Sequence, residues 1–453
     1  MRGSPGQPRS QRHHEDAVHR LQASYRAIPT GEPVRLAKPT SNLFRARART
    51  ATSGLDVSGL GAVLDVDPDG RTADVAGMCR YADLVAATLP HGLSPLVVPQ
   101  LKTITLGGAV AGLGIESASF RNGLPHESVL ELDVLTGTGE VVTVEPGDEL
   151  FAGFPNSYGT LGYATRLRIE LEPVPPYVAL RHVRFDDLRE LCDAIESIMA
   201  HRSFDGGRVD YLDGVVFSAT EAYLTLGTGT ENGGSASDYT GMQIYYRSIR
   251  QHRHDLLTIH DYLWRWDTDW FWCSRAFGAQ HPLLRRLWPA RLRRSDVYHR
   301  LVALDRWLRI SDRLSGPQER VVQDVEIPLE RTAEFLGWFL DHVPIEPIWL
   351  CPVRLRGQRR WPLYPLDPGR DYVNIGFWST VPIAPGAADG DVNRRIEATV
   401  SRLEGHKSLY SDSYYERAEF EARYGGEDYG VLKTSYDPDR RLADLYGKAV
   451  RRR

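Results

Sequence analysis

A glycine-rich stretch with interleaved hydroxyl side chains is the part of this sequence best suited to bind a phosphate. Between Pro99 and Gly123 it holds five glycines, with threonine and serine among them. Glycine leaves room for a ligand against the backbone, and main-chain N–H groups together with hydroxyls bind phosphate oxygens. The same composition is also typical of a run of tight turns. It is not a dinucleotide-binding fingerprint, because Ser117 stands where that spacing requires glycine or alanine.

The composition of the whole chain limits the classes of protein to which this glycine-rich stretch could belong. At 453 residues, two or three domains are expected, and 42% hydrophobic with 25% charged residues is typical of a globular protein. A formal net charge of -4 gives no general attraction to nucleic acid. The four cysteines lack metal-site or CxxC spacing, which predicts free thiols and no metal site. With no signal peptide and no run of about 18 apolar residues, we expect a cytoplasmic protein.

The first part of the chain predicts strands joined by turns. Residues 1–20 are expected to be a solvated basic arm, and Tyr81–Leu89 a short amphipathic helix. A strong turn signal, Asp67-Pro-Asp-Gly70, separates two apolar runs. The predicted strands are 62–66, 72–76, 129–135, 141–144 and 164–172. A proline cluster at 173–176 then marks a domain boundary.

Beyond the prolines, helices and strands are mixed. The predicted helices are 188–198, 330–341 and 391–403. The predicted strands are 215–217, 223–226, 348–353 and 372–377. Residues 407–438, rich in tyrosine and lysine, are expected to be site-forming loops.

Two unusual segments lie in this second part, and each has two interpretations. The aromatic run 262–272 either packs between domains or lines an apolar substrate pocket. The basic cluster 285–294 is interleaved with leucines and a tryptophan. It is either a solvated helix face or a contact with an anionic lipid surface, which would place the protein peripherally at the inner membrane face.

Several blocks together resemble the FAD-binding PCMH-type flavoproteins, the family of vanillyl-alcohol oxidase and p-cresol methylhydroxylase. The blocks are 40–44, 105–117, 159–165 and 432–438. The likeness is greatest to the Δ24-sterol reductase branch, which includes bacterial reductases of 10-methylene fatty acyl chains. It rests on the segments 105–117, 321–328, 347–352 and 409–414.

The resemblance implies an α+β fold in three parts after the arm. A two-subdomain PCMH-type FAD-binding domain would span 21–175, and a cap domain of antiparallel sheet plus helices would span 176–405. The C-terminal segment 406–453 would return to the flavin site. The animal enzymes carry an N-terminal hydrophobic anchor, which this sequence does not show.

The resemblance also implies an FAD site made of backbone cradles. The implied cofactor-binding residues are Pro39, Thr40, Ser41, Asn42, Leu43, Thr105, Leu106, Gly107, Gly108, Ala109, Val110, Ala111, Gly112, Leu113, Gly114, Ile115, Glu116, Ser117, Gly159, Thr160, Gly162 and Tyr163. Relatives that bind flavin covalently use histidine or cysteine, and the loop Lys38–Phe44 contains neither. We therefore expect non-covalent FAD, with His126 as a weak alternative.

The implied activity is reduction of a C=C bond in a lipid with NADPH or NADH. Arginine and alanine usage indicates a GC-rich bacterial gene, which favours a methylene-branched fatty acyl chain (10-methylene to 10-methyl) over a sterol-like Δ24 alkene. Lys433, in the motif that returns to the flavin, is the candidate cation for the reduced ring. The candidate proton donors are Tyr410, Tyr414, Glu326, Asp324 and His406.

Two alternatives stay open at this point. The wider family includes FAD-dependent oxidases and dehydrogenases of sugars, alditols and other alcohols. A non-catalytic flavin-binding or electron-transfer subunit would carry the same cradle without turnover. The lipid reductase interpretation implies a hydrophobic small-molecule partner, and the sequence does not indicate an oligomeric state.

Overall fold

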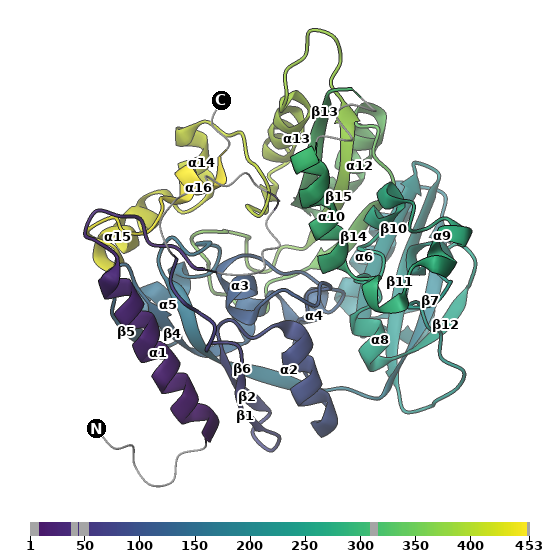
Figure 1. Ribbon diagram of the computed structural model, residues 1–453. Helices are drawn as coiled ribbons and strands as arrows, with labels where there is room; N and C mark the ends of the chain where they lie inside the picture. The colour runs from purple at the N-terminus through teal and green to yellow at the C-terminus, as the bar shows by residue number, and fades with distance from the viewer. Residues whose placement is uncertain (1–8, 38–43, 45–53, 309–315, 451–453) are drawn as a thin grey trace.

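The computed structural model of the chain shows a mixed α+β protein built on two antiparallel sheets (Figure 1). It describes residues 9–37, 44, 54–308 and 316–450, with side chains for all of these except 9 and 303–308. This agrees with the fold class expected from the sequence. Each sheet belongs to a different part of the chain, and β6 (Tyr163–Pro173) is the last strand of the first sheet.

The first sheet has the order β1-β2-β6-β4-β5, with β3 paired to β6. Its other strands are β1 (Val63–Asp67), β2 (Thr72–Ala76), β3 (Leu93–Pro95), β4 (Val129–Leu135) and β5 (Val141–Val144). On β6, Leu167, Ile169 and Leu171 are buried, as their alternation with charged residues predicts. The helices of this part are α2 (Tyr81–Thr88), α3 (Leu106–Ala111), α4 (Ser119–Asn122) and α5 (Glu149–Gly153).

The N-terminal segment differs from its prediction. Residues 9–20, expected as part of a solvated arm, begin the helix α1 (Arg9–Ala27), drawn in purple in Figure 1. Ala17, Leu21 and Tyr25 are buried in one cluster with Leu64 and other residues of the first sheet. These three positions repeat every four residues and so form one apolar face. Because polar and basic residues occupy most of the positions between them, this apolar face is not apparent from the composition of the segment.

The second sheet, of the cap, has the order β12-β7-β11-β10-β14-β15-β13-β16, and every pairing in it is antiparallel. The strands are β7 (Tyr177–Phe185), β10 (Tyr211–Ser218), β11 (Glu221–Thr230), β12 (His254–Thr258), β13 (Gln318–Pro328), β14 (Ile348–Val353), β15 (Tyr372–Pro382) and β16 (His406–Lys407). The remaining strands, β8 (Ser203–Phe204) and β9 (Gly207–Arg208), form a small hairpin. The predicted strands of the second part all fall within these bounds.

The two faces of the cap sheet have different neighbours. Three helices form a common core with one face: α6 (Leu188–His201), α12 (Leu329–His342) and α13 (Asp391–Arg402). The opposite face contributes Trp349, Cys351 and Tyr372 to the large core shared with the first domain. Alternate residues of β13, β14 and β15 therefore either enter the helix-covered core or face the first domain.

Short helices connect these strands and cover the cap. They are α7 (Tyr245–Ser248), α8 (Ile259–Leu263), α9 (Pro282–Leu287) and α10 (Ser295–Leu308). Four 3-10 turns occur at Leu89–His91, Pro125–Ser128, Cys273–Phe277 and Ala290–Leu292. In the part of the chain that the structure describes, no helix has both the length and the apolarity to cross a membrane.

The C-terminal segment agrees only in part with the loops expected over 407–438, because residues 408–416 are irregular but short helices follow them. It forms α14 (Arg417–Arg423), α15 (Gly426–Tyr436) and α16 (Leu445–Ala449), drawn in yellow in Figure 1. The segment returns to the first domain, because the Gly137 N–H donates to the Tyr436 carbonyl and the Val34 N–H to the Arg441 carbonyl. Of the tyrosines and lysines that suggested loops, Tyr429, Lys433 and Tyr436 lie on α15, whereas Tyr410 and Tyr414 lie in the irregular stretch before α14.

Candidate functional site

The first half of the glycine-rich segment is used for close packing inside the chain. Thr105 begins α3, and its hydroxyl accepts a hydrogen bond from the Gly108 N–H at 3.3 Å. A Cβ on Gly107 would lie 2.6 Å from the Gly77 carbonyl oxygen, and the Gly107 N–H donates to that oxygen. Glycine is therefore needed at position 107 so that α3 can pack against Gly77, the residue directly after β2. The N–H groups of this turn are committed to the fold.

The second half has the features of a ligand cradle. Among the described residues, no partner is found for the main-chain N–H groups of Leu113, Gly114 and Ile115. A Cβ on Gly114 would lie 2.9 Å from Pro99 Cγ and 3.0 Å from Pro125 Cγ, so no larger residue fits. Buried main-chain N–H groups require partners. An anionic cofactor against this turn would supply them.

Orphaned buried polar groups lie next to the same turn. The amide of Asn156 and the hydroxyl of Ser157 are buried without a hydrogen-bond partner. The following residue, Tyr158, donates its N–H to the Ala111 carbonyl, and a Cβ on Gly112 would meet the Tyr158 ring at 3.3 Å. Residues 113–115 and 156–157 thus present unsatisfied groups near one another, and these groups fit the polar phosphate and sugar of FAD.

The C-terminal segment contacts the Gly159–Tyr163 block through the side chain of Lys433. Gly159 and Gly162 have φ of +75° and +148°, which favours glycine. Lys433 Nζ donates to the carbonyls of Thr160 (2.7 Å), Leu442 (3.1 Å) and Ala443 (3.1 Å) and pairs with Asp437 at 2.6 Å. These contacts join Lys433 on α15 to the Gly159–Tyr163 block and to the segment that follows α15. The expectation that Lys433 faces the flavin ring stays a prediction.

The threonine–serine loop that the resemblance assigned to the cofactor, Pro39–Leu43, lies outside the described residues. Phe44, at its end, is described. Its N–H donates to the Tyr410 carbonyl at 2.9 Å, and its ring stacks on Trp270 at 5.6 Å. Phe44 therefore contacts both the cap, at Trp270, and the C-terminal segment, at Tyr410.

A cluster of polar side chains lies on the face of the cap sheet that is turned toward the first domain. Glu326 on β13 pairs in register with Asn374 on β15 and with His406 on β16. Asp324 lies two residues along β13 and so on the same face. Among the described residues, no hydrogen-bond partner is found for the buried atoms Asp324 Oδ1 and Glu326 Oε2 or for either amide atom of Asn374. These four residues form the carboxyl cluster.

Burial changes the protonation of this cluster. It raises the pKa of Asp324 to about 7, although the side chains of Tyr410 and Asn374 act in the opposite direction. Burial and the neighbouring Asp324 also raise the pKa of Glu326 well above its usual range. Burial lowers the pKa of His406 to about 4. At neutral pH the carboxyl pair therefore holds a proton, and the imidazole is neutral.

The two candidate tyrosines have different surroundings. The Tyr410 hydroxyl accepts a hydrogen bond from Trp378 Nε1 at 2.9 Å, and burial raises its pKa well above the usual range. Its effect on the pKa of Asp324 places it at the carboxyl cluster. Tyr414 instead donates its N–H to Glu397 on α13 and packs against Arg394. Tyr414 thus contacts α13, which covers the other face of the sheet.

A buried ion network joins the end of the glycine-rich segment to the cap. Arg265 lies 3.0 Å from Glu116 and 2.9 Å from Asp213, and all three side chains are buried. Ser117 donates to Glu116 and is 2.7 Å from the Tyr262 hydroxyl. Glu116 and Ser117, which the resemblance placed in the cofactor cradle, have their side chains committed to this network.

The aromatic run 262–272 packs in the core behind the carboxyl cluster. Phe271 lies 4.4 Å from Trp378 and 4.8 Å from Trp266, measured between ring centroids. Trp264, Trp266, Trp270, Phe271 and Trp272 are all buried. The run therefore packs between elements, as the first interpretation expects. Because Trp378 also contacts Tyr410, it gives the cluster an apolar wall.

His126, the weak candidate for a covalent flavin bond, is buried with neither ring nitrogen partnered. Its ring lies edge-on to Trp361 at 4.4 Å, and burial lowers its pKa to about 3. It follows Pro125, which contacts the Gly114 position, so it adjoins the cradle. The expectation of non-covalent FAD stays a prediction.

With this geometry in place, the comparisons with known proteins define the class. Residues 13–145 match a family model described as an FAD binding domain. This range contains most of α1, strands β1 to β5 and the glycine-rich segment. The first part of the chain is therefore similar to an FAD binding domain, and an antiparallel sheet with helices follows it.

Individual relatives extend the likeness over most of the chain. The human protein named Delta(24)-sterol reductase is 25% identical over 404 residues, covering 85% of this chain and 75% of its own. The Delta(24)-sterol reductase homolog dhcr-24 of Caenorhabditis elegans is 24% identical over 415 residues, covering 86% and 77%. Cytokinin dehydrogenase 10 of rice is 31% identical over 200 residues, covering 40% and 36%. The chain is thus similar to Delta(24)-sterol reductases across both domains.

Sequence reasoning missed two residues of this region. Asn374 stands in a predicted strand between Val373 and Ile375, and its polar side chain on the alternate face was the available signal. Arg265 stands inside the aromatic run, where a charge among tryptophans indicates a buried ion pair. Glu326, opposite Asn374 in the strand register, and Glu116 and Asp213, the partners of Arg265, lie far away in sequence, so these pairings could not be read from the sequence.

Proposed function

We propose that this protein is an FAD-dependent oxidoreductase that reduces a carbon–carbon double bond in a lipid, with NADPH or NADH as the reductant. The observation that carries the proposal is the buried Asp324–Glu326 carboxyl pair, which keeps a proton near neutral pH. The similarity to proteins named Delta(24)-sterol reductase over 85% of the chain supports a reductase.

Saturating an isolated double bond requires a hydride at one carbon and a proton at the other. When bound, FAD supplies the hydride. The carboxyl pair supplies the proton, because burial favours its neutral form and leaves Asp324 Oδ1 and Glu326 Oε2 without protein partners. Ser408 orients Glu326 with a hydrogen bond of 3.4 Å to Oε1. Tyr410, which keeps its own proton, adjoins Asp324.

The surroundings of the pair suit a hydrocarbon substrate. Trp378 and Phe271 place aromatic rings behind Tyr410, and Cys351 lies beside Asn374 in the register of β14 and β15. Such surfaces exclude water, which keeps a neutral carboxyl neutral. We propose a methylene-branched fatty acyl chain as the substrate, and a sterol-like Δ24 alkene as the next to test.

Anaerobic mixing of the FAD-loaded protein with candidate reductants tests the reaction class. We expect NADPH or NADH to bleach the flavin absorbance and a methylene-branched acyl lipid to restore it. Bleaching by a polyol or an aldonolactone, with none by either nicotinamide, would instead show an alcohol dehydrogenase or oxidase. The similarity to a cytokinin dehydrogenase makes that second candidate worth including.

Mass spectrometry of membrane fatty acids tests the substrate. Cells would express this chain together with a methyltransferase that makes methylene-branched lipids. We expect the methylene species to be replaced by a species heavier by two hydrogens. If the methylene lipids are unchanged but NADPH bleaches the flavin, the reductase activity remains supported and this lipid is excluded as the substrate. A protein that retains FAD but turns over with no lipid extract would be a non-catalytic flavoprotein.

A further inference from the structure

The surface helix α9 has its polarity reversed. Arg285 at its centre is 1% exposed, whereas Leu283 and Leu287, one turn apart, are 69% and 80% exposed. A surface helix normally buries its leucines and exposes its arginines. Leaving leucines in water costs free energy that burying them would recover. This reversal indicates that the leucines have a partner outside the chain.

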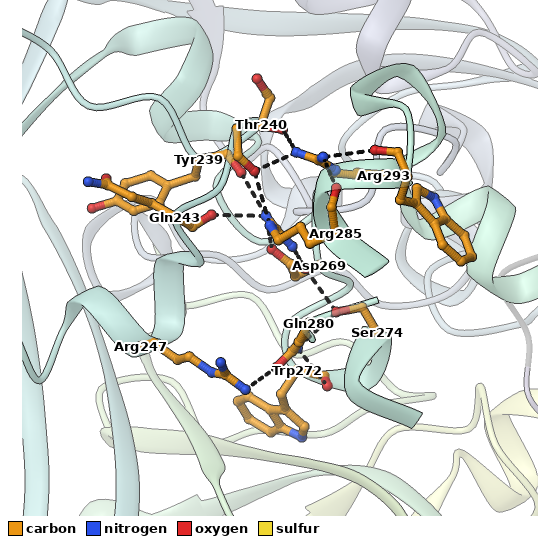
Figure 2. A network of polar contacts seen from close by, with 12 residues as sticks. Tyr239, Thr240, Gln243, Arg247, Asp269, Trp272, Ser274, Gln280, Arg285 and Arg293 are labelled. Carbon is orange, nitrogen blue, oxygen red and sulfur yellow. Dashed lines mark hydrogen bonds and ion pairs between the residues drawn. The ribbon is translucent and has the colours of Figure 1, made fainter. Parts of the chain in front are cut away.

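The fold holds the reversed helix rigidly. Arg285 pairs with Asp269 at 2.7 Å and donates to the carbonyls of Gly241 and Gln243 at 3.0 and 2.9 Å. Arg293 donates to the carbonyls of Thr240 at 2.6 Å and Trp288 at 2.8 Å. Figure 2 shows both guanidinium groups pointing inward at the Tyr239–Gln243 loop. The leucines are therefore presented by a fixed base, so the basic cluster is not simply a solvated face.

The exposed apolar residues of the described chain concentrate at this place. Six large hydrophobic side chains are exposed, and five of them lie on α9, on the turn after it or on the loop that Arg285 and Arg293 tie to it. The five, here called the leucine patch, are Met242, Leu283, Leu284, Leu287 and Leu292. A concentrated apolar patch on an otherwise polar surface marks a binding site.

The charged residues next to the leucine patch indicate the kind of partner that it binds. The segment 281–294 contains no aspartate or glutamate. Arg286 and Arg291 are exposed within it, and neither takes part in an ion pair among the described residues. Apolar side chains that point outward between arginines are the pattern of a segment that sits at an anionic lipid–water interface.

We propose that the leucine patch docks this protein on the surface of an anionic phospholipid bilayer, with the leucines among the acyl chains and Arg286 and Arg291 at the headgroups. Docking would bring the cap to a lipid surface without a membrane-spanning helix. The docking proposal rests on the surface residues alone, so it does not depend on the reaction proposed above.

Co-sedimentation of the FAD-loaded full chain with lipid vesicles tests the docking. We expect binding to phosphatidylcholine vesicles that contain about one third phosphatidylglycerol, and at least about tenfold weaker binding to pure phosphatidylcholine. Raising the salt from about 0.05 to about 0.5 M should weaken binding to the anionic vesicles. No binding to anionic vesicles at low salt would overturn the proposal.

Surface variants locate the contact. Leu283→Ser with Leu287→Ser should lower the partition coefficient by at least about tenfold, because both side chains enter the acyl region. Val431→Ser, which alters the exposed apolar residue at another site (53% exposed), is the matched control and should bind as wild type does. Unchanged thermal midpoints would show that the leucine variants fold.

Charge variants and self-association complete the test. Arg286→Glu with Arg291→Glu should abolish the preference for anionic vesicles, whereas Arg395→Glu on exposed α13 surface should not. If the leucine variants bind vesicles like wild type, another surface is responsible and the proposal fails. A dimer in solution that the leucine variants convert to monomer, without vesicle binding, would assign the patch to a second copy of this chain.

Discussion

The guanidinium of Arg265 lies 3.0 Å from the carboxylate of Glu116, and both side chains are excluded from solvent. Glu116 ends the glycine-rich segment, and Arg265 belongs to the aromatic run of the cap. The contact therefore couples the cofactor cradle to the cap by a buried charge pair, with Asp213 as the second carboxylate. A buried pair tolerates loss of one member poorly, because the remaining charge is left without compensation.

Replacing Arg265 with methionine should destabilise the protein strongly. Two buried carboxylates would lose their cation, and we expect the free energy of unfolding to fall by about 3–5 kcal/mol. Urea denaturation of the FAD-loaded protein measures this. Arg331→Met removes an exposed arginine paired with Glu334 and should cost less than about 1 kcal/mol. Equal losses for the two variants would contradict the coupling role of Arg265.

Neutral amides in place of the carboxyl pair should slow substrate reduction and leave the cofactor's reduction intact. Asp324→Asn and Glu326→Gln remove the transferable proton, so we expect kcat to fall by about 10²–10⁴-fold. Flavin bleaching by the nicotinamide should stay within a few-fold of wild type. Tyr414→Phe, on the α13 side of the sheet, is the control and should have little effect on either step. Loss of activity only in the Tyr414 variant would refute this assignment.

The pH dependence of turnover should follow the protonated carboxyl. Burial raises the pKa of Asp324 to about 7, and the proton donor is the protonated form. We therefore expect kcat to be constant below about pH 6 and to fall as pH rises through 7. Steady-state rates across this range check it. A rate that rises with pH would show instead that the group acts as a base.

The same raised pKa makes stability depend on pH. The folded state binds the Asp324 proton more tightly than the unfolded state, whose pKa lies near 3.8. The free energy of unfolding should thus decrease as pH rises from about 4 to about 7, by at most about 4 kcal/mol from this group. Asp324→Asn should remove that decrease. If the free energy of unfolding changes with pH in the same way in wild type and variant, this prediction is contradicted.

The glycine cradle predicts a specific loss of cofactor affinity. A Cβ at Gly114 would lie 2.9 Å from Pro99 Cγ and would displace the turn whose N–H groups we expect to bind the cofactor. Gly114→Ala should raise the Kd for FAD by at least about tenfold, or about 1.4 kcal/mol, in a fluorescence titration. Gly147→Ala, with nothing within 4 Å of the added carbon, should bind FAD as wild type does.

Lys433 should stabilise the C-terminal segment. Lys433→Met removes three hydrogen bonds to carbonyls and the pair with Asp437, so we expect the free energy of unfolding to fall by about 1–3 kcal/mol. If these contacts are its only role, the midpoint potential of the bound flavin should be unchanged. A shift of that potential to more negative values would support the role first expected for this lysine.

Local patterns in the sequence were sufficient for most of the fold. Alternation of Leu167, Ile169 and Leu171 with charged residues predicts β6, and the turn signal at 67–70 predicts the first hairpin, because a strand's burial pattern is a property of neighbours in the chain. The family resemblance identified the FAD-binding domain and the likeness to sterol reductases. The helix over residues 9–20 was missed, because its small apolar face is visible only against the sheet it covers.

What only the tertiary structure decided is which polar groups meet. The sequence named Asp324, Glu326 and Tyr410 as candidates, but strand register placed them beside Asn374 and turned Tyr414 toward α13. The glycine-rich segment divided into a packing half and a cradle half only when Gly77, Pro99 and Tyr158 were seen against it. Composition determines what a side chain can do. Burial and partners set its protonation and its role, and these depend on residues far away in the chain.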